Sequence, residues 1–391
     1  MIPFEEAYQI IRNAVIPLEK ETVLLADSQN RILAEEIVSD VNIPPFNKAA
    51  MDGFACRRTD LPGPLRIVDE IPAGKFPTVE IKEGECARIM TGAPIPAGAD
   101  VVFMVEYHEI QPDGSVIFTR DKTANNICLL GEDVKEGDVV LSKGTLIQPQ
   151  EIAILAGAGK TNVEVFRRPI VGVISTGSEL VEPNISPTAG QIRNSNGHQM
   201  VAQLKRMGMV AEYFGIVPDS QEELRKAIHS AMKMTDVLFI SGGVSVGDYD
   251  FVPLVLQELE FEILITSIAT KPGKHTLFAR KEGKYVLGFP GNPVSSFVQL
   301  ETVGRELLCS LMGNQPKSLK FKCVILDDYH RKAADRLEFL PVQITETGKV
   351  KLLPYNGSAH IHALSKANAI MEIPIGVKQI EQGDLVNVRP L

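Results

Sequence analysis

The spacing of apolar positions divides the chain into blocks of different periodicity. Residues 3–20 carry apolar side chains at helical spacing, which predicts an amphipathic helix, and residues 24–38 predict a short strand and then a brief helical or extended piece. From residue 41 to 146 the apolar runs are short and are separated by Gly, Pro and Asp, which is typical of a β-rich lobe, a small barrel or sandwich. Pro149 and Gly157 bound a further predicted helix.

Between residues 169 and 311 the pattern changes to strands that alternate with helices. The predicted strands are near-continuous apolar runs, at 171–175, 210–217, 236–240, 264–269 and 285–288. The predicted helices span 197–206, 220–232, 251–259 and 294–308. Such alternation predicts a parallel, doubly wound sheet that is covered by helices on both faces.

The remaining residues, 316–391, return to short apolar runs. We expect strands there at 320–326, 339–344, 350–353, 370–373 and 385–388. This block predicts a small C-terminal β domain. The chain as a whole is therefore expected to be a multidomain protein of α/β plus β class.

Composition excludes several classes of protein. With 391 residues, of which 44% are hydrophobic, the chain has material for several cores. Its net charge of −9 argues against a nucleic-acid partner, and no apolar run approaches the ~18 residues that a bilayer span needs. The first residues have neither the basic nor the apolar region of a signal peptide, so we expect a cytoplasmic protein without a membrane partner. The five cysteines form no C-x-x-C pair, which argues against disulfides and a thiolate zinc site.

Four loops of the α/β block are expected at the carboxyl ends of its strands. They are residues 175–180, 241–250, 271–275 and 290–295. Ligands of open α/β sheets bind at this edge, where loops and helix N-termini gather. Any one of these loops would be an ordinary glycine turn. Four of them at one edge favour a binding site.

The residue types in these loops suit an anionic ligand and a divalent ion. Glycines let the backbone approach a ligand, and Asn292 followed by a proline is the signature of a helix N-terminus whose amides face an anion. Lys271 and Lys274 add positive charge, and Glu179 and Asp250 supply carboxylates. Together they have the chemistry of a phosphate-plus-metal site.

In chain order, these loops and three turns of the β-rich lobe resemble the motifs of the MoeA family, the molybdopterin molybdenumtransferases, which are related to the E domain of gephyrin. The resemblance spans essentially the whole chain, and the segments that carry it are 50–55, 90–93, 131–133, 175–180, 241–250, 271–274 and 290–295. The sequence departs from the family pattern at Ser178, where many members have Asp, and at His275, where Pro is usual.

The resemblance implies an elongated, four-part subunit that forms a homodimer. Its parts would be a discontinuous domain (1–40 plus 145–168), a β-rich lobe (41–144), a pterin-binding α/β domain (169–315) and a small barrel-like C-terminal β domain (316–391). The implied reaction inserts molybdenum from molybdate into adenylylated molybdopterin and releases AMP. Mg²⁺ or Zn²⁺ is the implied cofactor, and the upstream adenylyltransferase is a further implied partner.

The family positions also imply roles for individual residues. Catalytic roles fall on Asp52, Asp219, Asp250, Lys271 and Lys274. Metal binding falls on Glu179 and Asp250. Substrate binding falls on Thr91, Asp133, Thr176, Gly177, Glu179, Gly242, Gly243, Ser245, Pro272, Gly291, Asn292, Ser295, Arg336 and Ser358. Among all these residues, Ser295, Lys274, Arg336 and Ser358 would form the molybdate pocket. Asp52, Thr91 and Asp133 would belong to the lobe of the partner subunit that closes over the site.

Two other functions stay open at this point. A pterin adenylyltransferase uses the same α/β domain but makes the adenylate instead of consuming it. A non-catalytic dimeric scaffold is the second alternative, because the related gephyrin domain clusters receptors. At the residue level, Arg336 also fits an exposed arginine at a strand end.

Overall fold

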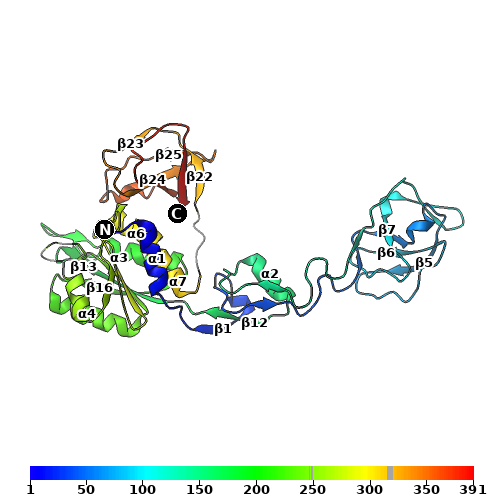
Figure 1. The fold of residues 1–391 in the computed structure, drawn as a ribbon, viewed down its shortest axis with the longest axis horizontal. Coiled ribbons are helices and arrows are strands. Elements are labelled where there is room, and N and C mark those ends of the chain that lie inside the picture. The colour runs from blue at the N-terminus through cyan, green and yellow to red at the C-terminus, as the bar shows by residue number, and fades with distance from the viewer. Residues whose placement is uncertain (246, 248–249, 315–319) are drawn as a thin grey trace.

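The chain folds into an elongated molecule whose parts lie in a row (Figure 1). The computed structural model describes residues 1–245, 247, 250–314 and 320–391. An α/β domain and the C-terminal domain lie together at one end, the β-rich lobe lies at the other, and a small body joins them (Figure 1). The expected boundary at 315/316 falls outside the described residues.

The α/β domain is built on a six-stranded sheet with the order β16-β13-β17-β21-β20-β18. Its strands are β13 (Ile170–Thr176), β16 (Val210–Val217), β17 (Val237–Ser241), β18 (Glu262–Ile265), β20 (Leu277–Lys281) and β21 (Lys284–Phe289). β13, β16, β17 and β21 are parallel, as the apolar runs predicted. The all-parallel expectation is wrong for β20, which pairs antiparallel with both β21 and β18.

Helices cover both faces of this sheet, which confirms the doubly wound expectation. The helices are α3 (Asn196–Arg206), α4 (Gln221–Met234), α5 (Val252–Glu258), α6 (Pro293–Gln299) and α7 (Arg305–Leu311). Side chains alternate along β17: Phe239 packs in one core with Met200 and Leu307, and Leu238 packs in the other with Ile228 and Val255. A buried sheet with two apolar faces explains why its strands read as continuous apolar runs.

The last predicted helix of this domain, 294–308, is present, but it extends to Leu311 and is not regular. A π-helical segment, η4 (Leu300–Gly304), joins α6 to α7. Glu301 in this segment is 2% exposed and accepts hydrogen bonds from Gln203 at 2.6 Å and Arg305 at 2.8 Å, and it also pairs with Arg206. The irregular turn of the helix therefore contains a buried carboxylate that has three hydrogen-bond or ion-pair partners.

The connecting body pairs the two ends of the predicted discontinuous domain. Its strands and helix are β1 (Lys20–Leu24), β2 (Ile37–Val38), β11 (Val139–Leu141), β12 (Asn162–Phe166), the 3-10 helix η1 (Leu25–Asp27) and α2 (Pro149–Gly157). β1 pairs with β12, and β2 pairs with β11. The first helix, α1 (Phe4–Ala14), ends before Pro17 and packs against α7 of the α/β domain, so it lies away from this body (Figure 1).

The β-rich lobe contains a four-stranded sheet with the order β5-β6-β4-β7. The elements of the lobe are β3 (Lys48–Ala49), β4 (Gly53–Cys56), β5 (Arg66–Ile71), β6 (Glu85–Ile89), β7 (Val101–Met104), β8 (His108–Ile110), β9 (Val116–Phe118), β10 (Ile127–Cys128), η2 (Arg58–Asp60) and η3 (Val105–Tyr107). One core lies on each side of this sheet, around Ile89 and around Phe103.

The C-terminal domain is a mixed sheet that takes one strand from the α/β domain. Its elements are β22 (Phe321–Val324), β23 (Tyr329–His330), β24 (Leu337–Ile344), β25 (Val350–Leu352), β26 (Ala369–Ile373), β27 (Gln379–Ile380), β28 (Leu385–Pro390) and η5 (Ile361–Ala363). The sheet runs β19-β24-β26-β28-β22, and β25 pairs with β24. The strand β19 (Thr270–Lys271) precedes β20 in the chain and pairs with β24, so it ties the two domains together. The barrel-like closure stays a prediction.

No described helix combines the length and apolarity that a membrane crossing requires.

Candidate functional site

Three of the four loops predicted to bind ligand meet at the carboxyl edge of the sheet. β13 ends at Thr176, β17 at Ser241 and β21 at Phe289, and all three strands are parallel. A Cβ added to Gly242 would lie 2.6 Å from the Thr176 carbonyl oxygen, and one added to Gly291 would lie 3.9 Å from the Gly242 Cα. The loops therefore pack against each other, and the glycines permit that close approach.

The fourth loop, residues 271–275, reaches the same edge because β20 runs in the opposite direction and begins there. Gln299 holds this loop: its side-chain amide donates to the Thr270 hydroxyl at 3.0 Å and to the Pro272 carbonyl at 3.1 Å. Gly273 has a φ of +100°, and an added Cβ would lie 2.3 Å from Gln299 Nε2. The hydrogen bonds from Gln299, the last residue of α6, thus fix the position of the loop.

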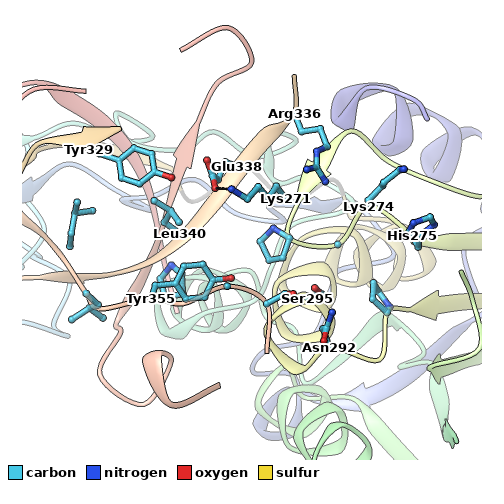
Figure 2. Close-up of a pocket in the computed structure, with 18 residues that line it drawn as sticks. Lys271, Lys274, His275, Asn292, Ser295, Tyr329, Arg336, Glu338, Leu340 and Tyr355 are labelled. Atoms are coloured by element: carbon cyan, nitrogen blue, oxygen red, sulfur yellow. Dashed lines mark ion pairs between the residues drawn. The ribbon is translucent and has the colours of Figure 1, made fainter. Parts of the chain in front are cut away.

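A pocket of about 710 Å³ lies between this edge and the C-terminal domain (Figure 2). It is lined by Lys271, Pro272, Gly273, Lys274, His275, Pro290, Asn292, Ser295, Tyr329, Arg336, Glu338, Leu340, Pro341, Leu352, Leu353, Tyr355, Gly357 and Ser358. The structure therefore brings together seven residues that the sequence predicted, namely Lys271, Pro272, Lys274, Asn292, Ser295, Arg336 and Ser358.

The N-terminus of α6 forms one wall of the pocket. Asn292 is the residue before the helix, and Pro293 is its first residue. The amide of Val294 donates to the Ser358 carbonyl at 3.0 Å, so the C-terminal domain is fastened to the helix start. Ser295 in the first turn is 3% exposed and lines the pocket.

Three cationic side chains reach the pocket, and their partners differ. Lys271 pairs with Glu338 at 2.7 Å, and Figure 2 shows the two side chains pointing toward each other. Arg336 lies 3.7 Å from Asp335, and its guanidinium donates to the Thr270 carbonyl at 3.5 Å. Within the described residues Lys274 has no ion-pair partner. Of the three charges, that of Lys274 is most available to an anion.

Four residues of this wall were missed or underrated by sequence reasoning: His275, Tyr329, Glu338 and Tyr355. Burial lowers the pKa of His275 and Lys274 adds to the effect, although Asp250 opposes it. Burial raises the pKa of Tyr329 and, to about 12, that of Tyr355, in both cases with Glu338 as a further cause. At neutral pH these three rings are therefore uncharged.

The predicted carboxylates lie on the loops at the open sheet edge. Asp219 accepts a hydrogen bond from the Ser178 amide at 2.9 Å, and its own amide donates to the Ser178 hydroxyl at 3.1 Å. Asp250 accepts from the Gly247 amide at 2.8 Å, and Glu179 is exposed. In the described part of the chain no three His, Cys, Asp or Glu side chains gather as a metal site.

The remaining predicted residues of this edge are partly described. Thr176 and Gly177 are buried at the end of β13, and Gly243 and Ser245 are half-buried after β17. Val246, Asp248 and Tyr249 of the same motif lie outside the described residues.

Asp52, Thr91 and Asp133 do not line this pocket. Asp52 and Thr91 adjoin β4 and β6 of the β-rich lobe, which lies at the other end of the molecule from the α/β domain (Figure 1), and Asp133 lies between β10 and β11. Asp52 accepts two hydrogen bonds from Thr91, one from its amide and one from its hydroxyl, both at 2.6 Å. These bonds hold the pKa of Asp52 below its usual range. Asp133 is exposed, and its amide donates to the Ile43 carbonyl.

A larger cavity, of about 1350 Å³, lies elsewhere, beside α1 and α7. Several cations line it, but acids already pair with many of them, for example Arg12 with Glu306 at 2.5 Å and Lys320 with Glu372 at 2.5 Å. The pocket at the carboxyl edge lies where parallel strands end and contains seven residues that the sequence predicted, so it is the stronger candidate.

Comparison with known proteins matches three segments of the chain. Residues 2–159 match the family described as MoeA N-terminal region (domain I and II), residues 172–309 match a probable molybdopterin binding domain, and residues 324–391 match the MoeA C-terminal region (domain IV).

Similar proteins cover the whole length of the chain. A molybdopterin molybdenumtransferase of Staphylococcus aureus is 35% identical over 400 residues, covering 99% of this chain and 95% of that protein. One of Bacillus subtilis is 33% identical, covering 99% and 93%. The crystal structure of the molybdopterin biosynthesis moeA protein from Pyrococcus horikoshii OT3 is 30% identical, with a TM-score of 0.85 and full coverage of both chains.

Proposed function

The chain belongs to the MoeA family, and from this premise we propose that it is a molybdopterin molybdenumtransferase of molybdenum cofactor biosynthesis. The proposed reaction takes adenylylated molybdopterin and molybdate, inserts molybdenum into the dithiolene and releases AMP. The chain acts as the enzyme of that step, and its pocket at the sheet edge is the proposed reaction site.

The pocket between the α/β and C-terminal domains carries this proposal. Both reactants are anions that repel each other, so a site that joins them needs positive charge and oriented amides. Lys271, Lys274 and Arg336 supply the charge, and Ser295 in the first turn of α6 supplies an amide and a hydroxyl. Molybdate is proposed to bind among Lys274, Ser295, Arg336 and Ser358.

The adenylated end of the substrate is proposed to lie along the neighbouring loops after β13, β16 and β17. Thr176, Gly177, Gly242 and Gly243 allow a ligand to approach the backbone there. Asp219 is fixed by Ser178, so it orients the loop after β13 relative to the loop after β16. Cleavage of a phosphoanhydride is mainly positioning and charge stabilisation, and a rigid strand-end cradle provides both.

The donor chemistry at this edge fits a magnesium ion that is shared with substrate. Glu179 and Asp250 are hard oxygen donors on loops that follow adjacent strands. Mg²⁺ commonly binds one or two carboxylates plus substrate phosphates, whereas Zn²⁺ needs three or four protein ligands, and the described residues offer no such cluster. We therefore propose that Glu179 and Asp250 hold Mg²⁺, which when bound would offset charge on the phosphates.

The complete site is proposed to need two subunits. Asp52, Thr91 and Asp133 do not line the pocket of their own chain, and Asp52 and Thr91 adjoin strands of the β-rich lobe, at the other end of the molecule (Figure 1). The lobe of a second copy could supply them to the α/β pocket of the first, in a closed two-fold arrangement.

Release of AMP tests the proposal. The purified protein is incubated with adenylylated molybdopterin and Mg²⁺, with and without molybdate, and AMP is measured by chromatography. We expect AMP release that depends on molybdate, together with formation of the molybdenum cofactor. Consumption of ATP with accumulation of the adenylate would instead indicate an adenylyltransferase, and no turnover with an intact dimer would favour a scaffold.

A further inference from the structure

Glu338 is a buried carboxylate at the wall of the proposed reaction pocket. Its side chain is 2% exposed, and it lies on β24 of the C-terminal domain. One carboxylate oxygen is 2.7 Å from Lys271 Nζ, and the other is 3.2 Å from Arg331 Nη1. Tyr329 also hydrogen-bonds to it. A buried acid with a partner on each oxygen has a fixed position.

Arg331 fixes Glu338 from the interior of the C-terminal domain. This side chain is 3% exposed, donates to the Val377 carbonyl at 2.6 Å and donates to the Arg336 carbonyl at 3.0 Å. Its guanidinium is therefore held by main-chain groups and cannot follow Glu338 if the carboxylate moves. The buried part of the cluster lies in the C-terminal domain, and the half-exposed part is Lys271.

Lys271 comes from the other domain and has a flexible stem. Its Cα is the register partner of the Glu338 Cα in the parallel pairing of β19 with β24, which places both side chains on the same face of the sheet. The side chain is 51% exposed, so burial does not hold it. Lys274, three residues along, lacks such a partner among the described residues.

We infer that Glu338 is a positioning residue, which holds the Lys271 ammonium at the wall of the pocket for the proposed transfer of molybdenum. The inference rests on the proposed function for its catalytic part. A lysine on a flexible stem must be ordered before it can stabilise developing charge, and an ion pair with a fixed acid orders it in advance. Glu338 acts through Lys271.

Glu372 provides a matched control in the same sheet. It is 5% exposed on β26, beside β24, and it pairs with Lys320 at 2.5 Å and Arg389 at 3.5 Å, away from the pocket. Glu372→Gln removes a buried acid with two cationic partners, as Glu338→Gln does. General loss of stability should therefore be similar in the two variants.

The first test needs no turnover. The full-length protein is treated with a trace of an amine-reactive acetylating reagent, and the labelling of Lys271 relative to Lys274 is read by mass spectrometry. Glu338→Gln should raise this ratio about threefold, the size expected for loss of a half-exposed ion pair, whereas Glu372→Gln should leave it unchanged. An unchanged ratio in Glu338→Gln would overturn the inference. If that variant does not fold, Glu338→Asp, which keeps the charge but shortens the reach, should raise the ratio by a smaller factor, and no change would count equally against it.

The second test separates positioning from general damage. In the AMP-release assay, Glu338→Gln should lower kcat about tenfold and leave the KM for molybdate equal or lower, because a negative charge is lost near the anion. In a Lys271→Met background the same substitution should lower kcat no further. The catalytic part would be overturned if Glu338→Gln lowered kcat by the same factor in the wild-type and Lys271→Met backgrounds. It would also be overturned if Glu372→Gln lowered kcat as much as Glu338→Gln does.

The two tests fail separately. A wild-type protein that releases no AMP contradicts the proposed function, while the labelling ratio still decides whether Glu338 holds Lys271. If the wild-type protein releases AMP but Glu338→Gln leaves the labelling ratio unchanged, only the positioning role is contradicted.

Discussion

Gly273 lies in the wall of the pocket at a position where both the backbone conformation and the available space exclude a larger residue. Its φ of +100° is outside the range that other residues adopt readily, and Gln299 fills the space where a Cβ would lie. Replacement by alanine must either twist the backbone or push Gln299 away from Thr270. Either change moves the loop that carries Lys271 and Lys274.

Gly273→Ala should therefore lower the free energy of unfolding by about 2–4 kcal/mol, from backbone strain plus overpacking. It should also raise the KM for molybdate, because the two lysines shift. Gly283→Ala is the control: φ there is +76°, but no atom lies within 4 Å of the added Cβ, so about 1 kcal/mol is expected and no change in KM. Equal effects of the two substitutions on stability and KM would show that the contact with Gln299 is unimportant.

For single residues, the sequence predicts a place in the site when the residues next to them in the chain indicate a turn or a helix start. Lys271 and Lys274 flank a Pro-Gly turn, and Asn292 precedes a proline, so their placement in a loop or at a helix start could be predicted. Glu338 could not, because its role depends on pairing with β19, which lies about 70 residues earlier in the chain. The one available signal is a charged residue inside the apolar run of β24.

At the scale of elements, long periodic segments were predicted well and short ones were missed. α2 and β16 have the predicted bounds. β20 was missed, although the two residues before β21, Glu282 and Gly283, both have positive φ as a two-residue hairpin turn requires. The segment 264–269 was assigned one strand, but β18 ends at Ile265. Tertiary pairing decides such short elements.

Asp236 joins two neighbouring strands of the central sheet at their amino ends. It accepts two hydrogen bonds from Arg167, at 2.8 and 3.0 Å, and one from the Ile170 amide at 2.9 Å. Burial alone would raise the pKa of Asp236, but Arg167 and the Ile170 amide outweigh it and the pKa is lowered. The clamp fixes the start of β13 relative to β17.

Because the pKa is lower in the folded state, ionised Asp236 stabilises the fold above its unfolded pKa of about 3.9, and this stability is lost as the pH falls through the lower folded value. Asp236→Asn should therefore cost roughly 1–2 kcal/mol at pH 7, and the difference from wild type should shrink below about pH 4. Urea unfolding followed by circular dichroism at pH 7 and pH 3 measures it. Asp113→Asn, at an exposed acid whose partner is Ser115 two residues along the chain, should have little effect at either pH. A difference that does not depend on pH would contradict the assigned cause.

At the scale of the whole molecule, the resemblance implied an elongated subunit, and the structure confirms that shape (Figure 1). Periodicity alone separated the β-rich lobe, the α/β block and the C-terminal β domain. It could not show that α1 packs on the α/β domain, because the apolar stripe of a helix does not identify the surface that it covers.

The proposed site shared between two subunits has a consequence for mixed dimers. In a dimer of one Asp52→Ala chain and one Asp250→Ala chain, one site would combine the two intact parts and the other site would carry both defects. If the chains associate at random, half of the dimers are mixed and each has one intact site, so about a quarter of wild-type AMP release should return. Each variant alone should remain inactive.

A second mixture provides the control for that measurement. Asp250→Ala and Lys271→Ala both alter the α/β edge of their own chain, so every site in their mixed dimer is damaged and no activity should return. The two mixtures are prepared by co-expression and compared in the same AMP-release assay. Restoration in the first mixture only would require that Asp52 of one chain completes the pocket of another. Equal activity in the two mixtures would contradict a site that is shared between two subunits.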